Sequence, residues 1–270
     1  MKKNSLILAT ILTMTMALVG CSSSSSSTST STNADTSTLL GQIKSAGKIR
    51  IGTEGTYSPF TYHDITGKLT GFDIEIAEAI AAKLGVKTEY VETKWDGIFA
   101  GLDAKRFDII VNEVGISAER QAKYDFSDPY ILSKPVLIVE KDNTSITKFE
   151  DLKGKKSAQS LTSNLGKIAT SNGAELVAVD GFNQSIDLIT SKRADATIND
   201  SLSFLDLKKQ KPDIAVKVVA EGKEADKNGI MLNKGNKELL DAVNKALTDI
   251  KADGTYLKIS QKWFGADVSK

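Results

Sequence analysis

The chain has 270 residues, with 35 Lys and Arg against 34 Asp and Glu, one Cys and one His. This near-neutral balance argues against nucleic-acid binding, which demands a basic stripe. One Cys excludes a disulfide within the chain, and a lone His without a Cys or second His makes a poor zinc site. We therefore expect no nucleic-acid partner, no metal and no cofactor. His63, between Tyr62 and Asp64, is expected in a solvated loop.

Residues 1–20 have the pattern of a signal peptide. Two lysines precede an apolar run from Leu6 to Leu18, which is shorter than the roughly 20 residues that span a bilayer. The Leu-Val-Gly-Cys sequence ending at Cys21 resembles the bacterial lipobox, so we expect lipidation of Cys21 after cleavage. Residues 21–38, rich in Ser and Thr, then form a flexible tether. The alternative is a secreted protein in which Cys21 is incidental.

Strand-like and helix-like segments alternate from residue 39 onward. Strands are predicted at 49–53, 87–91 and 107–111, and helices at 73–84 and 96–104. After Pro135, strands are predicted at 136–139, 156–159, 176–179 and 195–199, with helices beginning at Ser163, Asn183 and Ser201. The chain closes with a helix at 237–253 and a shorter one through Trp263. The alternation is typical of parallel βαβ units and predicts an α/β fold.

Residues 102–113 resemble residues 189–200 at an offset of 87. Lys, Arg, Asp and Asn match in register, and each segment ends in a carboxylate, Glu113 or Asp200. The match extends back to Trp95 opposite Phe182. It predicts two lobes built from one βα unit, with a cleft between them, unless the identities arose by chance. Because ligands bind outside the carboxyl ends of strands in open α/β sheets, Asn112, Glu113 and Asp200 are candidate cleft residues.

Two loops carry further candidate ligand groups. The loop from Gly52 to Phe60 holds a carboxylate and two aromatic residues, but its glycines fit no nucleotide-binding motif. Phe60 is as readily a core residue as a ligand contact. Ser117 is expected to cap a short helix with Arg120 in its first turn, where backbone N–H groups and a guanidinium would suit a carboxylate. The alternative for Arg120 is a surface ion pair.

Several motifs together resemble the polar amino-acid solute-binding proteins of bacterial ABC importers, over about residues 39–270. The motifs are Gly52-Thr-Glu-Gly-Thr-Tyr-Ser-Pro-Phe60, Gly71-Phe-Asp-Ile-Glu75, Lys94-Trp-Asp-Gly97, Ile116-Ser-Ala-Glu-Arg120, Tyr124-Asp-Phe-Ser-Asp-Pro-Tyr130 and Asp253-Gly-Thr. Within this family, the chain looks most like the cystine-binding branch.

The resemblance implies a two-lobed periplasmic-binding-protein type II fold with a ligand cleft between the lobes. Residues 39–132 and 231–270 are expected to form lobe 1, and residues 133–230 lobe 2. The lobes would close about a hinge on one amino acid, and the closed monomer, lipid-anchored outside the cytoplasm, would dock on an ABC permease.

The resemblance also implies roles for individual residues. Arg120 would bind the ligand α-carboxylate, helped by Ser163 and Asn164 at a helix start, and Asp200 would bind the α-ammonium. The remaining expected contacts are the aromatic walls Tyr57, Phe60 and Trp95, and the polar positions Glu54, Asn112, Glu113 and Gly115.

Two of these positions depart from the family pattern. At position 115, Gly replaces a Thr or Ser that is common in relatives and whose hydroxyl reaches the ligand carboxylate. Only the backbone N–H of Gly115 could make that contact here. Glu113 replaces the Gln of the cystine branch, so the distal specificity stays open among cystine, cysteine, glutamine, histidine and arginine.

Two other functions fit the same fold. One is a periplasmic dehydratase resembling those that act on prephenate or arogenate, with Glu54 or Glu113 as the proton donor if burial raised its pKa. The sequence has no more obvious donor, so we expect no enzymatic activity. The other is an extracellular sensor domain, although the sequence shows no transmembrane helix or signalling domain.

Overall fold

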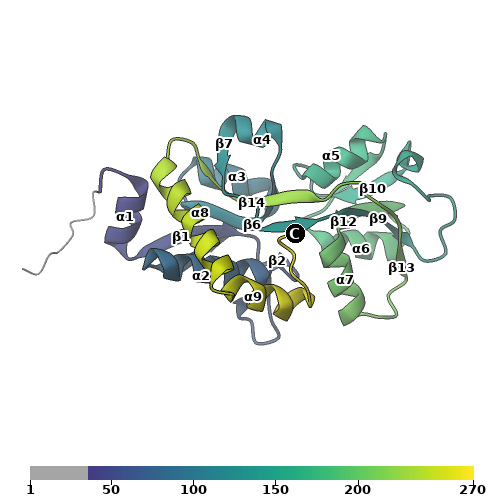
Figure 1. The fold of residues 1–270 in the computed structure, drawn as a ribbon. Coiled ribbons are helices and arrows are strands. Elements are labelled where there is room, and N and C mark those ends of the chain that lie inside the picture. The colour runs from purple at the N-terminus through teal and green to yellow at the C-terminus, as the bar shows by residue number, and fades with distance from the viewer. Residues whose placement is uncertain (1–35) are drawn as a thin grey trace, which may run out of the picture. The chain divides into compact units, whose positions relative to one another are not determined.

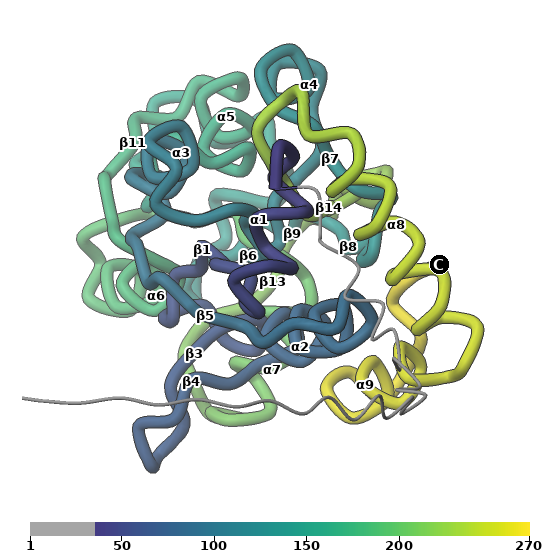
Figure 2. Tube along the Cα trace, turned by 90° about the vertical axis from the view of Figure 1, so that its left-hand side faces the viewer, coloured from purple at the N-terminus to yellow at the C-terminus, as the bar shows by residue number. Residues whose placement is uncertain are grey.

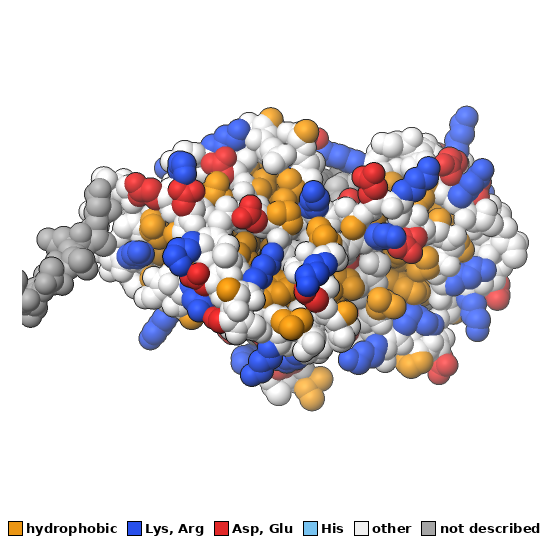
Figure 3. All heavy atoms as spheres, in the orientation of Figure 1, with side chains coloured by type: hydrophobic (Ala, Val, Ile, Leu, Met, Phe, Trp, Pro, Cys, Tyr) orange, Lys and Arg blue, Asp and Glu red, His pale blue; other side chains and the backbone are white. Residues whose placement is uncertain are grey.

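The computed structural model describes residues 36–270. The predicted signal peptide, the predicted lipidation site Cys21 and most of the predicted tether lie outside the described residues. None of the helices within 36–270 has the length and apolar character needed to cross a bilayer. On the face drawn in Figure 3, Lys and Arg side chains are interspersed with Asp and Glu side chains.

The first of two large sheets is six-stranded and mixed, in the order β5-β1-β6-β14-β7, with β8 also paired to β14 (Figure 1). Its strands are β1 (Lys48–Thr53), β5 (Lys87–Glu92), β6 (Ile109–Gly115), β7 (Tyr124–Phe126), β8 (Ile131–Ser133) and β14 (Asp226–Asn233). β1, β5 and β6 are parallel, whereas β14 runs antiparallel to β6.

Helices cover both faces of this sheet because side chains alternate along its strands. In β6, Ile109 and Val111 pack on one face, against a core that includes residues of α1, α2, α8 and α9. Ile110 and Val114 pack on the other face, against α3. These helices are α1 (Leu39–Ala46), α2 (Phe72–Leu84), α3 (Trp95–Asp103), α8 (Lys237–Ala252) and α9 (Thr255–Phe264).

The second large sheet is five-stranded, in the order β11-β10-β12-β9-β13. Its strands are β9 (Pro135–Glu140), β10 (Lys156–Gln159), β11 (Glu175–Ala178), β12 (Ala196–Asp200) and β13 (Val216–Glu221). Val136 and Ile138 face a core with α6 and α7, while Leu137 and Val139 face the opposite core. The helical elements are η1 (Phe149–Leu152), α5 (Asn164–Ser171), α6 (Phe182–Thr190) and α7 (Ser201–Gln210).

A small third sheet follows β1 and consists of β2 (Thr56–Tyr57), β3 (Thr61–His63) and β4 (Leu69–Thr70). In Figure 2 the β3–β4 turn projects below the rest of the chain. His63 lies in β3 rather than in a solvated loop, and its Nε2 is 3.2 Å from Glu92 Oε1. The prediction of a loop was wrong, although His63 is exposed to solvent as predicted. The remaining short helix, α4 (Ala118–Lys123), is capped by Ser117 as predicted.

Strands and helices predicted from periodicity are present within a few residues of their predicted limits. The prediction described only parallel units. It missed α1, η1, the three strands β2, β3 and β4 of the small sheet, and β7, β8, β13 and β14. β9 and β14 are antiparallel to their neighbours. The most important omission is β14. The chain returns from the second sheet to the first at this strand, which pairs with β6 and β8.

The internal repeat is confirmed by the structure. Its two copies are α3–β6 and α6–β12, and the repeated lysines share a left-handed backbone, with φ of 56° at Lys105 and 59° at Lys192. The repeated aspartates also share a role. Asp108 accepts a 2.8 Å hydrogen bond from the N–H of Arg50, and Asp195 accepts one of 2.8 Å from the N–H of Lys156.

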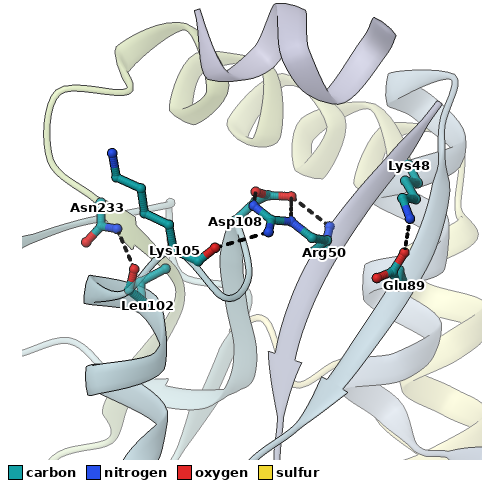
Figure 4. A network of polar contacts seen from close by, with 7 residues as sticks. All are labelled: Lys48, Arg50, Glu89, Leu102, Lys105, Asp108 and Asn233. Atoms are coloured by element: carbon teal, nitrogen blue, oxygen red, sulfur yellow. Dashed lines mark hydrogen bonds and ion pairs between the residues drawn. The ribbon is translucent and has the colours of Figure 1, made fainter. Parts of the chain in front are cut away.

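The two aspartates differ in burial and in the number of hydrogen bonds that they accept. Asp108 is buried and also accepts from the Arg50 side chain, at 2.6 Å from Nη2 and 3.3 Å from Nε (Figure 4). Asp195 is exposed and accepts from one backbone N–H. An Asn side chain can replace Asp where one oxygen accepts a single hydrogen bond. It cannot replace a carboxylate that binds a guanidinium through both oxygens.

We expect Asp108→Asn to lower the free energy of unfolding by about 1.5 to 3 kcal/mol, because hydrogen bonds to charged groups contribute that much. Asp195→Asn, at the matching position of the repeat, should cost less than about 0.5 kcal/mol. Denaturant unfolding of both variants measures the difference. Equal costs would show that the Arg50 side-chain contact adds nothing to stability.

Candidate ligand site

A cavity lies between the two large sheets and encloses about 730 Å³, part of it open to solvent. Eight residues predicted to bind ligand line it: Glu54, Tyr57, Trp95, Asn112, Glu113, Ser163, Asn164 and Asp200. They come from the carboxyl ends of β1, β6 and β12, from β2 and from the starts of α3 and α5. The carboxyl ends of strands are where ligands bind in open α/β sheets.

The lining of this cavity is acidic. Four carboxyl groups contribute to it, from Glu54, Glu113, Asp200 and Asp226, whereas the described lining residues include no Lys, Arg or His. Tyr57, Trp95 and Phe182 supply apolar surface. Buried carboxylates without a cation are unfavourable. The cavity therefore suits a ligand that combines an ammonium group with an aliphatic part.

Asn112 positions Glu54 at the end of β1. Its Nδ2 donates to Glu54 Oε2 at 2.7 Å, while its Oδ1 accepts from the Glu54 backbone N–H at 2.7 Å and from Thr53 Oγ1 at 3.0 Å. Burial raises the pKa of Glu54 to about 7, against the lowering effect of the Asn112 hydrogen bond. Glu54 is thus held in one orientation in a poorly solvated place.

Glu113 and Asp200 meet from opposite sheets. Glu113 ends the repeat in β6 and has a left-handed φ of 49°, an uncommon conformation that clusters at functional sites. Ser133, at the end of β8, places its Oγ 3.2 Å from Glu113 Oε1 and in a short hydrogen bond with Asp200 Oδ2. Burial raises the pKa of both carboxyl groups, and that of Glu113 is further raised by the Asp200 charge.

Two of the helix starts that face this cavity, those of α5 and α7, are capped by side chains that line it. Asp200 is the N-cap of α7 and accepts from the N–H groups of Leu202 and Ser203, at 2.8 and 3.4 Å. Ser163 is the N-cap of α5 and accepts from the Gly166 N–H at 2.9 Å. A helix start favours an anion through its free N–H groups. The start of α5 is therefore suited to a carboxylate, while that of α7 is already occupied by Asp200.

Arg120 does not line the cavity in this structure, although it is buried. Its Nη1 donates to the Gly115 carbonyl at 2.9 Å and its Nη2 to the Thr162 carbonyl at 3.3 Å. The guanidinium carbon lies 5.4 Å from the Trp95 ring centre and 5.1 Å from that of Phe99. The sequence alternative of a surface ion pair is wrong, because Arg120 instead bridges the two sheets directly behind the Trp95 wall.

Gly115 and Phe60 also lie outside the cavity lining. A side chain at Gly115 would place a Cβ 3.1 Å from Asn164 Nδ2 and 3.4 Å from Asn228 Oδ1, so the approach of β14 and α5 explains the glycine. Phe60 is fully buried in the core, with its ring centre 5.1 Å from that of Tyr57. The structure thus favours the core interpretation of Phe60, which supports the Tyr57 wall.

Sequence reasoning missed several lining residues, including Ser133, Gln159, Phe182, Asp226 and Asn228. Phe182 had a usable signal, since it matches Trp95 in the repeat and begins α6 as Trp95 begins α3. Asp226 and Asn228 lie on β14, the antiparallel strand that periodicity did not reveal. Asn228 donates to Glu113 Oε1 at 3.1 Å, and Asp226 accepts from Asn164 at 3.1 Å.

Direct contacts join the two sheet units across the cavity. Tyr57 donates to Asn199 Oδ1 at 3.0 Å, and Ser58 donates to Asp206 Oδ2 at 2.7 Å. At another edge of the cavity, Asp96 accepts from both the backbone N–H and the hydroxyl of Thr162, at 3.0 and 2.7 Å. These contacts bring the cavity walls together, which is a closed arrangement.

The family profile of bacterial extracellular solute-binding proteins, family 3, matches residues 49–266. The chain belongs to this family, and the fold class predicted from its sequence is confirmed. It is 48% identical over 238 residues to the L-cystine-binding protein TcyA of Bacillus subtilis, covering 88% of each chain. It is 42% identical over 235 residues to the L-cystine-binding protein TcyJ of Escherichia coli K12, covering 86% of this chain and 88% of the relative.

Solved structures of similar proteins differ in how well they superpose. An ancestral arginine-binding protein bound to arginine is 43% identical, with a TM-score of 0.77, covering 81% of this chain and 99% of that one. The L-cystine solute receptor of Neisseria gonorrhoeae, unliganded and open, is 50% identical, yet its TM-score is 0.58, with coverage of 86% and 99%. The more similar sequence superposes less well, as expected if the present structure is closed.

Proposed function

We propose that this protein captures L-cystine outside the cytoplasm and delivers it to the permease of an ABC importer. The observation that carries the proposal is the acidic cavity between two sheets, which presents carboxyl groups to a ligand and no basic side chain from its described lining. Cystine brings two ammonium groups and an apolar disulfide-linked centre. The similarity to the cystine-binding relatives supports this choice over a ligand with one ammonium group.

Within the cavity, Asp200 and Glu113 receive one ammonium group of the ligand. Its neighbouring carboxylate turns toward the start of α5 at Ser163 and Asn164. The Arg120 guanidinium, which donates to the Thr162 carbonyl behind the Trp95 wall, adds positive charge on that side. Tyr57 and Trp95 enclose the aliphatic part. Asp226 and Glu54 remain for the second ammonium group. Each sheet thus supplies part of the site, so the ligand favours the closed form because only there do both parts contact it.

The hinge lies where the chain passes between the sheets. One passage is Ser133 to Pro135, between β8 and β9, and the other precedes Asp226, between β13 and β14. With the hinge there, lobe 1 comprises residues 39–132 and 226–270, and lobe 2 residues 133–225. The boundary at 231 expected from the sequence falls inside β14, which pairs with β6 and β8. Ser133 contacts both carboxyl groups of the ammonium site and lines the cavity, so the hinge adjoins the proposed ligand site.

A dehydratase on the same fold is the second candidate. The Glu54 pKa of about 7 favours it, since such a carboxyl group suits general acid catalysis. An ancestral amino acid-binding protein described as a precursor of cyclohexadienyl dehydratase is 38% identical, with a TM-score of 0.76. Consumption of prephenate or arogenate by the purified protein would establish this candidate instead.

We expect L-cystine to raise the melting temperature more than any of the twenty common amino acids, after unfolding and refolding to remove copurified ligand. A ligand at 100 times its dissociation constant adds about 2.7 kcal/mol, which corresponds to about 5 to 10 °C for a protein of this size. Thermal-shift measurements with each compound test this. A larger shift with another amino acid would reject cystine but leave the family assignment intact.

We also propose that Cys21 carries a lipid that anchors the protein to the cell membrane. Replacing Cys21 with Ala should abolish incorporation of labelled palmitate without changing ligand affinity, because residues 21–38 separate the lipid from the folded domain. Label that persists in the variant would place the lipid elsewhere, and weakened binding would show that the anchor contacts the site.

A further inference from the structure

The strand β6 is irregular where it reaches the cavity. Its register against β14 shifts between Ile110 and Val114, and Asn112 and Glu113 lie in this β-bulge. Successive side chains of a regular strand point to opposite faces of a sheet, yet Asn112 and Glu113 both line the cavity. A bulge re-aims a side chain in this way, and bulges are common next to functional sites. The bulge therefore brings two consecutive polar side chains to one cavity.

Glu113 is the left-handed residue of this bulge, with φ of 49°. Residues other than glycine seldom adopt such a conformation, and they keep it only where surrounding contacts enforce it. The repeat does not impose it, because Asp200, at the matching position, has φ of −70°. By contrast, Lys105 and Lys192 are left-handed in both copies. The conformation of Glu113 must therefore come from contacts that are particular to the first sheet.

Tyr130 supplies such a contact from the segment before β8. Its side chain is fully buried, and its hydroxyl accepts from the Glu113 N–H at 3.1 Å. The hydroxyl donates its own proton to Asp73 Oδ1 at 2.9 Å, which leaves its lone pairs for the Glu113 N–H. Asp73, in the first turn of α2, is also fully buried, and among the described residues its Oδ2 has no hydrogen-bond partner. The Asp73 carboxyl group thus serves to orient the Tyr130 hydroxyl.

The backbone and the side chain of Glu113 are held by the same pair of neighbours. The Tyr130 N–H donates to the Asn228 carbonyl of β14 at 3.0 Å, and the Asn228 side chain donates to Glu113 Oε1 at 3.1 Å. Asp73, Tyr130, Asn228 and Glu113 lie in strands of the first sheet, in α2 or in the segment between β7 and β8. These contacts therefore do not depend on contact between the two large sheets.

We propose that Tyr130 and Asp73 are positioning residues of the ligand site, which hold the β6 bulge so that the Glu113 carboxylate meets the ligand ammonium. The inference rests on the proposed role of Glu113 in binding that ammonium group. Tyr130 and Asp73 lie outside the cavity lining, so they act on affinity through Glu113. Their effect on affinity should disappear when residue 113 carries no charge.

The test is a double-mutant cycle measured on the full protein by titration calorimetry. The titrant is L-cystine or, if cystine does not bind, the amino acid that gives the largest thermal shift. Tyr130→Phe removes one hydroxyl and keeps the ring stacked on Phe72, with 6.2 Å between ring centres. We expect it to weaken affinity about tenfold, because the charged hydrogen bond to the ligand is misplaced. In the Glu113→Gln background the same change should alter affinity by about twofold or less.

Tyr124→Phe is the matched control. Tyr124 is another buried phenol of the first sheet, and it donates to Asp103 Oδ2 at 3.1 Å but lies outside the cavity lining. Removing its hydroxyl should lower stability to denaturant while ligand affinity stays unchanged. Asp73→Asn keeps an oxygen for the Tyr130 hydroxyl and should bind ligand as the wild type does, whereas Asp73→Ala should lose affinity as Tyr130→Phe does. If Asp73→Ala fails to fold, the Tyr130→Phe cycle decides on its own.

Three results would overturn the proposal, with circular dichroism confirming that each variant is folded. One is unchanged affinity in Tyr130→Phe. Another is an equal loss from Tyr130→Phe in the wild-type and Glu113→Gln backgrounds, because the hydroxyl would then act independently of Glu113. The third is a Glu113→Gln variant that binds as tightly as the wild type, and in that case the error lies in the proposed ammonium site.

Discussion

The burial of carboxyl groups without a basic partner is the constraint on which the rest of this site depends. Glu54, Glu113, Asp200 and Asp226 line the cavity, and ionised carboxylates in such a place cost several kcal/mol each unless a cation or strong donors compensate. Asn112, Ser133 and the start of α7 provide donors for some of these oxygens. The remaining deficit in positive charge makes the empty site costly to close and favours an ammonium ligand.

The contacts across the cavity rim explain why closure depends on the ligand. Lys94 and Asp180 form an ion pair of 2.7 Å, but their side chains are 75% and 55% exposed. Such surface pairs contribute little stability. The hydrogen bonds from Thr162 to Asp96 and from Tyr57 to Asn199 are of the ordinary kind, each worth about 1 kcal/mol net. Closure therefore rests on a small sum of weak contacts, to which a ligand held by both sheets adds the decisive part.

Much of the fold was predictable from the sequence because its strands and helices have strong local periodicity. The repeat was also predictable, and it located Asn112, Glu113, Asn199 and Asp200 at the ends of equivalent strands. The pairing of β14 with β6 was not, because those strands are far apart in the chain and antiparallel pairing leaves no mark on either segment alone. Asp226 and Asn228 were missed for that reason.

The positions of Phe60 and Arg120 show a different limit of prediction from local sequence. Both were identified as candidate ligand contacts from local sequence, but burial depends on what packs above a residue. Phe60 is covered by Phe264 of the last helix, with 5.9 Å between ring centres. Arg120 lies against Trp95 and Phe99, and its guanidinium donates to one carbonyl group at the end of β6 and another in the loop before α5. Neither environment is encoded near the residue itself.

The most direct test of this charge compensation removes both carboxylates of the ammonium site at once. Glu113→Gln combined with Asp200→Asn preserves size, and Asn is as good an N-cap for α7 as Asp. The single Asp200→Asn variant is less decisive, because Glu113 then ionises more easily. Charged hydrogen bonds contribute about 1.5 to 3 kcal/mol each, so titration calorimetry near pH 7 should show cystine affinity at least about tenfold weaker. A folded double variant that binds as tightly as the wild type would contradict charge compensation as the basis of binding.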